Sequence, residues 1–264
     1  MADRRWPAYL YASDLGHPPA NNMNFNVWRV INAQAASFID RYARPGAGGL
    51  PPAVFQEQVV TCDGSAGSVF VSDALSRIAP GRVTLGSSEP GHVTASAPTD
   101  SAAGTASDPL AFYIGNGAKG GCIKLPGAPP ANGAMTSWTF PVCSGFTLLG
   151  EPALTLHAGI MGTDVEVNSR LWDEAPDGSL TLVSRGMYRW RGAAGPVSIT
   201  YALVGGGWTF AAGHQLRIEV TQNDAPYMRL DNYPSAIKYS SMSLTLPVRA
   251  ASSCWWRPVA SVLW

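Results

Sequence analysis

The sequence has few charged side chains, and these balance: 14% of its 264 residues are charged and the formal net charge is zero. A nucleic-acid-binding protein carries a basic face, so we expect no nucleic-acid partner. No apolar run approaches the roughly 18 residues that a membrane helix needs, so we expect no membrane partner either. The N-terminal stretch MADRRWPAYLYAS has too short an apolar core for a secretory signal peptide.

Motifs of two common hydrolase types are missing as well. No G-x-S-x-G occurs, and the nearest segment, Gly64-Ser65-Ala66-Gly67, has Asp63 where the first glycine should be. No serine is therefore presented on a nucleophile elbow. Neither HExxH nor a CxxC pair occurs, which argues against a zinc site of either pattern.

Cysteine is scarce, and its four positions match no metal-binding spacing. Cys62, Cys122, Cys143 and Cys254 allow three pairings into two disulfides, or remain buried thiols. Such cysteines favour an exported parent protein, although the sequence leaves the localisation open.

Alternating apolar and polar residues fill the chain from Phe146 to Val248. Period two means that each strand buries one face and exposes the other. Gly- and Pro-rich turns separate the runs. The pattern predicts a mainly β fold, a jelly-roll or galactose-binding-like antiparallel β-sandwich. The alternating apolar residues are Leu154, Leu156, Val165, Val167, Leu180, Leu182, Val197, Ile199, Tyr201, Leu216, Ile218, Val220, Leu244 and Leu246.

Further strands are expected before this stretch, at 55–60, 69–71 and 82–85, all joining the sandwich, and at 137–140. Between residues 86 and 133 Ser, Ala, Gly and Pro dominate. A segment with so few large apolar groups predicts a long surface excursion.

The N-terminal region has a different pattern. Residues 8–11 predict a short buried strand, a loop follows, and residues 24–42 predict an amphipathic helix. Its apolar face holds Trp28, Ile31, Ala35, Phe38 and Tyr42, and Pro45-Gly46 ends it. We expect this helix either to fold back on the sandwich or to mediate a symmetric homodimer, because an exposed apolar face usually finds a partner.

Six short motifs then follow one another in a fixed order: Leu149-Gly150-x-Pro152, Arg170-Leu171-x-Asp173, Pro176-Asp177-Gly178, Ser184-Arg185-Gly186, Phe210-x-x-Gly213-His214 and Asp224-x-Pro226. In this order they resemble the C-terminal non-catalytic domain of the X-Pro dipeptidyl-peptidase and cocaine-esterase (CocE/NonD) family of serine hydrolases. The resemblance implies a jelly roll packed on an α/β-hydrolase domain, shaping the active site without supplying the nucleophile.

The N-terminal strand, loop and helix resemble the end of that α/β-hydrolase domain, with Gly16-His17-Pro18 where the family carries its triad histidine. The family's serine and triad acid would precede His17, but only sixteen residues do. We therefore expect a truncated C-terminal module, begun at an internal methionine, with a structural or substrate-gating role. Its expected parts are a hydrolase remnant (1–48), the β-sandwich (49–250) and an irregular tail (251–264).

For the cysteines, the resemblance implies a disulfide between Cys62 and Cys122. Proximity in the sequence alone would favour Cys122 and Cys143.

Two other functions remain open. The first is a stand-alone hydrolase of small activated esters or phosphoesters that uses zinc or another divalent metal. Its catalytic residues would be His17 and Asp14, with His92 and Asp63 completing the ligand set, since imidazole and carboxylate suit zinc. The second is a carbohydrate-binding jelly roll, with a stacking platform made of Trp172, Tyr188, Trp190, Trp208 and Tyr227.

Simpler roles compete with these. We expect His92 to be solvated, His157 to lie on the surface and His214 to hydrogen-bond a turn. The carboxylates Asp173, Glu174 and Asp177 fit turn chemistry around Pro176-Asp177-Gly178, and core packing is the default for the aromatic residues.

Overall fold

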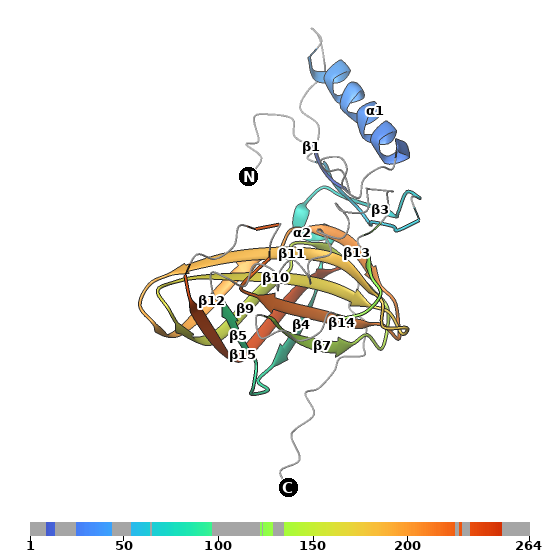
Figure 1. The fold of residues 1–264 in the computed structure, drawn as a ribbon. Helices are drawn as coiled ribbons and strands as arrows, with labels where there is room; N and C mark the ends of the chain where they lie inside the picture. Colours follow the sequence, from blue (N-terminus) through green and yellow to red (C-terminus); the bar gives the residue numbers. More distant parts are fainter. Residues whose placement is uncertain are drawn as a thin grey trace.

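A computed structural model describes residues 9–13, 25–43, 54–63, 65–96, 122, 124–128, 135–224, 227–228 and 233–249 (Figure 1). Two antiparallel sheets face each other and form a β-sandwich, with a smaller unit of one helix and three strands beside it. The mainly β fold expected from the sequence is confirmed. No helix in the described ranges is long and apolar enough to cross a membrane.

One sheet of the sandwich has five strands. In spatial order these are β6 (Lys124–Leu125), β11 (Leu180–Arg191), β10 (Asp164–Glu174), β14 (Gln215–Thr221) and β7 (Met135–Pro141).

The other sheet has seven strands. Five follow one another in the order β12 (Gly195–Ala202), β9 (Ala153–Met161), β15 (Ser235–Val248), β8 (Phe146–Gly150) and β13 (Gly206–Phe210), and β15 also pairs with β4 (Gly81–Ser87) and β5 (Val93–Ser96).

The core lies between these sheets, and the period-two pattern predicted most of its members; Leu180 and Leu182 are not part of it. Five of the predicted members are fully buried and belong to one continuous apolar cluster: Leu154, Leu156, Val165, Val167 and Ile218. The cluster joins residues from both sheets, so the two faces that the alternation marks as apolar are the faces that meet.

The excursion expected over 86–133 is not wholly irregular. Strand β5 pairs with β15, and β6 pairs with β11 at the edge of the five-stranded sheet. Both strands are short and polar, with burial patterns that alternate only over two to four residues, so the composition hid them.

The smaller unit, called here the N-terminal unit, consists of β1 (Tyr9–Ala12), α1 (Phe25–Tyr42), β2 (Val54–Gln58) and β3 (Val69–Ser72). Strand β1 pairs with β2 in parallel, with α1 as the crossover between them, and β2 pairs with β3 antiparallel. The prediction that the strands at 55–60 and 69–71 join the sandwich is therefore wrong. A local apolar pattern predicts a strand but not its partner. The partner of β2 is β1, whose residues lie more than 40 positions away across a helical crossover.

Helix α1 begins and ends close to the predicted limits. Among the helix residues whose burial is described, 27–42, only Val27 is buried, while Ile31, Gln34, Phe38 and Tyr42 are half-buried along one face. Figure 1 shows α1 standing away from the sandwich, beyond β1 and β3, so it does not fold back on the sandwich. The rings of Tyr9 and Tyr42 both pack on Phe38, with ring centroids 5.2 and 4.8 Å from it.

A disulfide joins Cys62 and Cys122, with their Cα atoms 4.9 Å apart. This confirms the pairing that the family resemblance implied, and the pairing of Cys122 with Cys143 is wrong. Cys143 is also disulfide-bonded. The bridge ties the segment after β2 to the strand at the edge of the five-stranded sheet. The domain limits 1–48, 49–250 and 251–264 stay a prediction.

Candidate functional site

Of the four residues proposed as metal ligands, the structure describes His92 and Asp63. His17 and Asp14 lie outside the described residues. Ser13, which precedes Asp14, donates to the Gln58 Oε1 atom at 2.7 Å. Within the described ranges no group of three or more His, Cys, Asp or Glu residues could hold a metal ion.

Asp63 is occupied by local hydrogen bonds. Its carboxylate accepts from the backbone N–H of Ser65 at 2.9 Å, and bonds from the Ser65 side chain and backbone lower the pKa of this carboxyl group. This is an Asx turn, a common way to satisfy a loop aspartate.

His92 is not the solvated residue that we expected. It is half-buried, its Nδ1 lies 2.7 Å from the Thr136 hydroxyl, and its ring packs on Trp138 with centroids 4.3 Å apart. Burial lowers the pKa of the imidazole. The expectation failed because β5 runs along the sandwich instead of lying in a loop, and His92 leads directly into that strand.

His214 belongs to a polar contact that connects the two sheets. Its Nδ1 lies 2.8 Å from the Asp173 carboxylate, whose other oxygen accepts from Trp208 Nε1 at 3.0 Å. Asp173 ends β10 in one sheet and Trp208 lies on β13 in the other. Asp173 is therefore a link between the sheets rather than a turn residue, whereas Asp177 binds Ser179 within the expected turn. His157 is on the surface, as expected.

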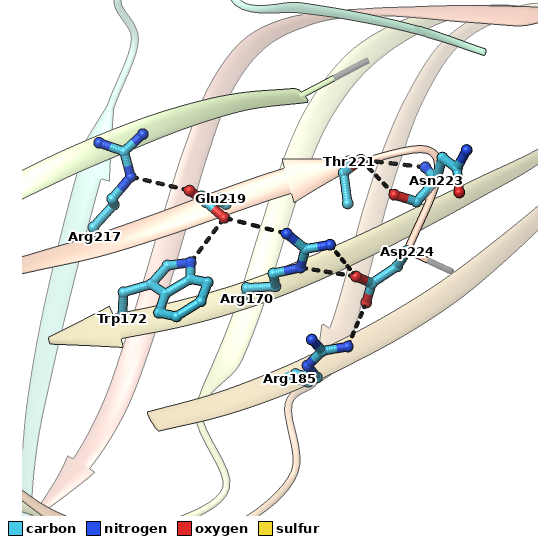
Figure 2. Close-up of polar contacts among 8 residues, drawn as sticks. All are labelled: Arg170, Trp172, Arg185, Arg217, Glu219, Thr221, Asn223 and Asp224. Atoms are coloured by element: carbon cyan, nitrogen blue, oxygen red, sulfur yellow. Dashed lines mark hydrogen bonds and ion pairs between the residues drawn. The ribbon is translucent and has the colours of Figure 1, made fainter. Parts of the chain in front are cut away.

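The outer face of the five-stranded sheet carries a buried group of charges. This charge network comprises Arg170, Arg185, Arg217, Glu219 and Asp224 (Figure 2). Arg170 donates to Asp224 Oδ1 through Nε at 2.8 Å and through Nη2, and Arg185 donates to Asp224 Oδ2 at 3.2 Å. Arg170 and Asp224 are both fully buried. Buried charges are tolerated only where, as here, each is paired.

The network continues along the sheet through Glu219. Its Oε2 accepts from Trp172 Nε1 at 2.8 Å and lies 3.8 Å from Arg170 Nη1, and its Oε1 accepts from Arg217 at 3.2 Å. Figure 2 shows Arg170 between Glu219 and Asp224, so charges of opposite sign alternate along the sheet. The sequence pointed to Arg170, Arg185 and Asp224 only as members of the motifs Arg170-Leu171-x-Asp173, Ser184-Arg185-Gly186 and Asp224-x-Pro226, because period two predicts a solvent-exposed outer face.

The charge network fixes the segment that follows β14. Thr221 Oγ1 donates to the Asn223 carbonyl at 3.0 Å, and the Asp224 backbone carbonyl accepts from the Met228 N–H at 2.9 Å. The Arg185 guanidinium lies 4.5 Å from the centre of the Tyr227 ring, a cation–π contact. These contacts stabilise the turn that follows β14 at the end of the sandwich.

The aromatic residues proposed as a sugar platform are engaged elsewhere. Tyr188, Trp190 and Trp208 pack against the core, and Trp172 is fully buried beneath the charge network. Their predicted role in packing is confirmed.

Exposed large apolar side chains are concentrated on the N-terminal unit, although some also lie on the sandwich. Tyr9 and Leu10 of β1 are 44% and 47% exposed, and Ile39 of α1 is 59% exposed. Two shallow grooves, of about 320 and 490 Å³, run between β1 and α1 and share Tyr9, Gln34 and Phe38 in their walls. Parallel strands are normally covered on both faces, and β1 has one paired neighbour in the described part of the chain. This surface is the main candidate for function.

Comparison with known proteins agrees with this architecture. The structure is similar to a CocE/NonD family hydrolase from Staphylococcus aureus, with a TM-score of 0.54 and 12% identity, over 92% of this chain and 54% of that protein. The chain resembles the C-terminal part of CocE/NonD hydrolases.

It is also similar to an aminopeptidase from a marine sediment archaeon, Thaumarchaeota archaeon, with a TM-score of 0.50 and 13% identity, over 84% of this chain and 44% of that protein. No protein-family model and no curated protein matches the chain. The chain thus spans about half the length of these solved proteins. At such low identity, the likeness establishes the fold.

Proposed function

We propose that this chain is the C-terminal module of a CocE/NonD-like hydrolase, with a structural or substrate-gating role and without a catalytic serine of its own. The observation that carries the proposal is the junction of two fold types in one chain. A β-sandwich follows a parallel strand–helix–strand unit that has the form of the last part of an α/β sheet.

The N-terminal unit supplies the surface for the other half of such an enzyme. One edge of strand β1 is unpaired in the described part of the chain and offers a place for a further parallel strand, and the exposed side chains of α1 and β1 offer an apolar face to the layers around it. The occupant that fits is an α/β domain, because parallel strands occur almost only in sheets with both faces covered. The S. aureus hydrolase, of which this chain matches about half, has the additional length for such a domain.

That the chain has no catalytic serine of its own is supported by its sequence. It has no G-x-S-x-G segment, and Ser65, the serine nearest to that pattern, lies in a turn where its side chain contacts Thr61 at 3.4 Å. A working serine nucleophile needs a base within hydrogen-bond reach.

Labelling with a fluorophosphonate probe, combined with hydrolysis of p-nitrophenyl acetate, tests the proposal on the purified chain. We expect no labelled serine and no turnover above the buffer rate, and Ser65→Ala should behave in the same way. Stoichiometric labelling of a serine, or turnover that is lost in a single-residue variant, would show that the chain is itself an enzyme.

A further inference from the structure

The N-terminal unit and the sandwich meet in a small apolar junction. Val59, Ile78 and Leu149 form its buried centre, with Phe55 and Phe70 packed against them. Ile78 belongs to α2 (Leu75–Ile78), and Leu149 belongs to β8 of the sandwich. The junction is separate from the main core, so it can open without unfolding the sandwich.

A carboxyl group lies inside this apolar junction. Glu57 is on β2 between Phe55 and Val59, and alternation along the strand turns all three side chains to the same face. Its partner across the sheet is Phe70. Glu57 is only 4% exposed, and its Oε1 atom has no hydrogen-bond partner among the described residues. The carboxylate accepts a hydrogen bond from the backbone N–H of Gly150.

The charged groups on the elements around Glu57 are engaged elsewhere. Arg77 pairs with Asp73 at the surface, at 2.7 Å. Arg249 donates to the carbonyl groups of Arg77 and Ile78 at 3.2 Å each. Glu151, which follows Gly150, is exposed. Among the described residues no ion pair compensates the Glu57 charge; the Arg249 guanidinium lies over the neighbouring Phe70 ring, 5.4 Å from its centre. Burial is the main cause that raises the pKa of Glu57, opposed by the bond from Gly150.

The backbone contact beside Glu57 leaves no room for a side chain at Gly207. Val60 N–H donates to the Gly207 carbonyl at 2.8 Å, which bridges the end of β2 to β13. A Cβ atom at Gly207 would lie 2.5 Å from the Gln58 carbonyl oxygen, so the bridge requires glycine there. The end of β2 therefore lies directly against β13 of the sandwich, and Glu57 is covered only while the N-terminal unit is docked in this way.

We propose that Glu57 makes the docking of the N-terminal unit on the sandwich pH-dependent, by binding a proton when the junction closes. The docked carboxyl group holds its proton more tightly than the undocked one. Docking is therefore strongest below the ordinary pKa of glutamate, and it weakens as pH rises through the raised pKa of the docked form. Because the same unit carries the open β1 edge, the orientation of that edge would follow pH. This inference does not depend on the proposed function.

Hydrogen exchange of the full chain at pH 5 and pH 8, corrected for intrinsic rates, tests it. The opening constant of residues 54–72, measured against β10 and β14, should rise about tenfold for each pH unit between the two pKa values and then level off. In Glu57→Gln, which keeps the shape and the acceptor for Gly150 without a charge, this rise should disappear. The matched control Glu151→Gln should keep it, and Gly207→Ala should open the junction at both pH values.

Two results would overturn the proposal. The first is an opening constant in the unmodified chain that is equal at pH 5 and pH 8. The second is a pH dependence that survives unchanged in Glu57→Gln.

Discussion

Arg170 and Asp224, 54 positions apart in the sequence, form a fully buried ion pair in which two guanidinium nitrogens contact one carboxylate oxygen. Arg170 extends from the middle of β10, and Asp224 follows the end of β14 (Figure 2). The pair joins the outer face of the five-stranded sheet to the turn beyond β14. It belongs to a network in which Arg185 also donates to Asp224 and Glu219 lies 3.8 Å from Arg170.

Breaking this pair should strongly destabilise the sandwich. Asp224→Asn removes one charge and leaves Arg170 buried beside a neutral group, which is expected to reduce the free energy of unfolding by about 3–5 kcal/mol. Arg77→Ala is the control, because its pair with Asp73 is exposed (69% and 61%) and should contribute about 1 kcal/mol or less. Urea denaturation followed by circular dichroism measures both variants, and an equal loss in the two would contradict the prediction.

The bridge between Cys62 and Cys122 should stabilise the chain by closing a loop of 60 residues. The double variant Cys62→Ser, Cys122→Ser is expected to lose roughly 3–4 kcal/mol, chiefly because its unfolded state gains conformational freedom. Thermal unfolding with and without reductant checks this: reductant should lower the midpoint of the unmodified chain towards that of the double variant. Thiol titration of the denatured, unreduced chain that finds all four cysteines free would refute the bridge.

The apolar face of the N-terminal unit should cause the isolated chain to self-associate. Without an α/β domain, we propose that this face pairs with its counterpart on a second copy, giving a homodimer through α1 and β1. Light scattering over a concentration series should show a mass that rises from monomer to dimer. Ile39→Lys and Leu10→Lys should keep the chain monomeric, whereas Met161→Lys, at a residue that is 63% exposed on β9 of the sandwich, should not. A monomer at every concentration would remove this proposal.

The metal hypothesis for His17, Asp14, His92 and Asp63 stays a prediction, and elemental analysis of the purified chain can test it. Asp63 and His92, the two of these residues that the structure describes, already have other partners, which argues against a fully occupied metal site. Asp63 accepts from Ser65, and His92 Nδ1 pairs with Thr136. We expect less than one equivalent of any divalent metal and no change in thermal stability on chelation. Stoichiometric zinc that is lost in both His17→Ala and Asp14→Asn would restore the metal-dependent hydrolase as an explanation.

The sequence by itself determined the strands of the sandwich and their inward faces. Leu216, Ile218 and Val220 alternate with polar neighbours, and this local period survives folding because a strand points successive side chains to opposite sides. The helix at 25–42 could be predicted for the same reason, since a period of 3.6 and a Pro-Gly stop are local properties.

Only the tertiary structure decided which strands pair and which polar groups are buried. Strands β2 and β3 resemble the sandwich strands in composition, but β2 pairs with β1 across a helical crossover and β3 pairs with β2, and no local pattern encodes that choice. Arg170 and Glu219 occupy polar positions that alternation assigns to solvent, yet both are fully buried. Glu57 is likewise buried between apolar neighbours. Burial of a charged group depends on what the fold brings against it, and for these residues the partners come from distant parts of the chain.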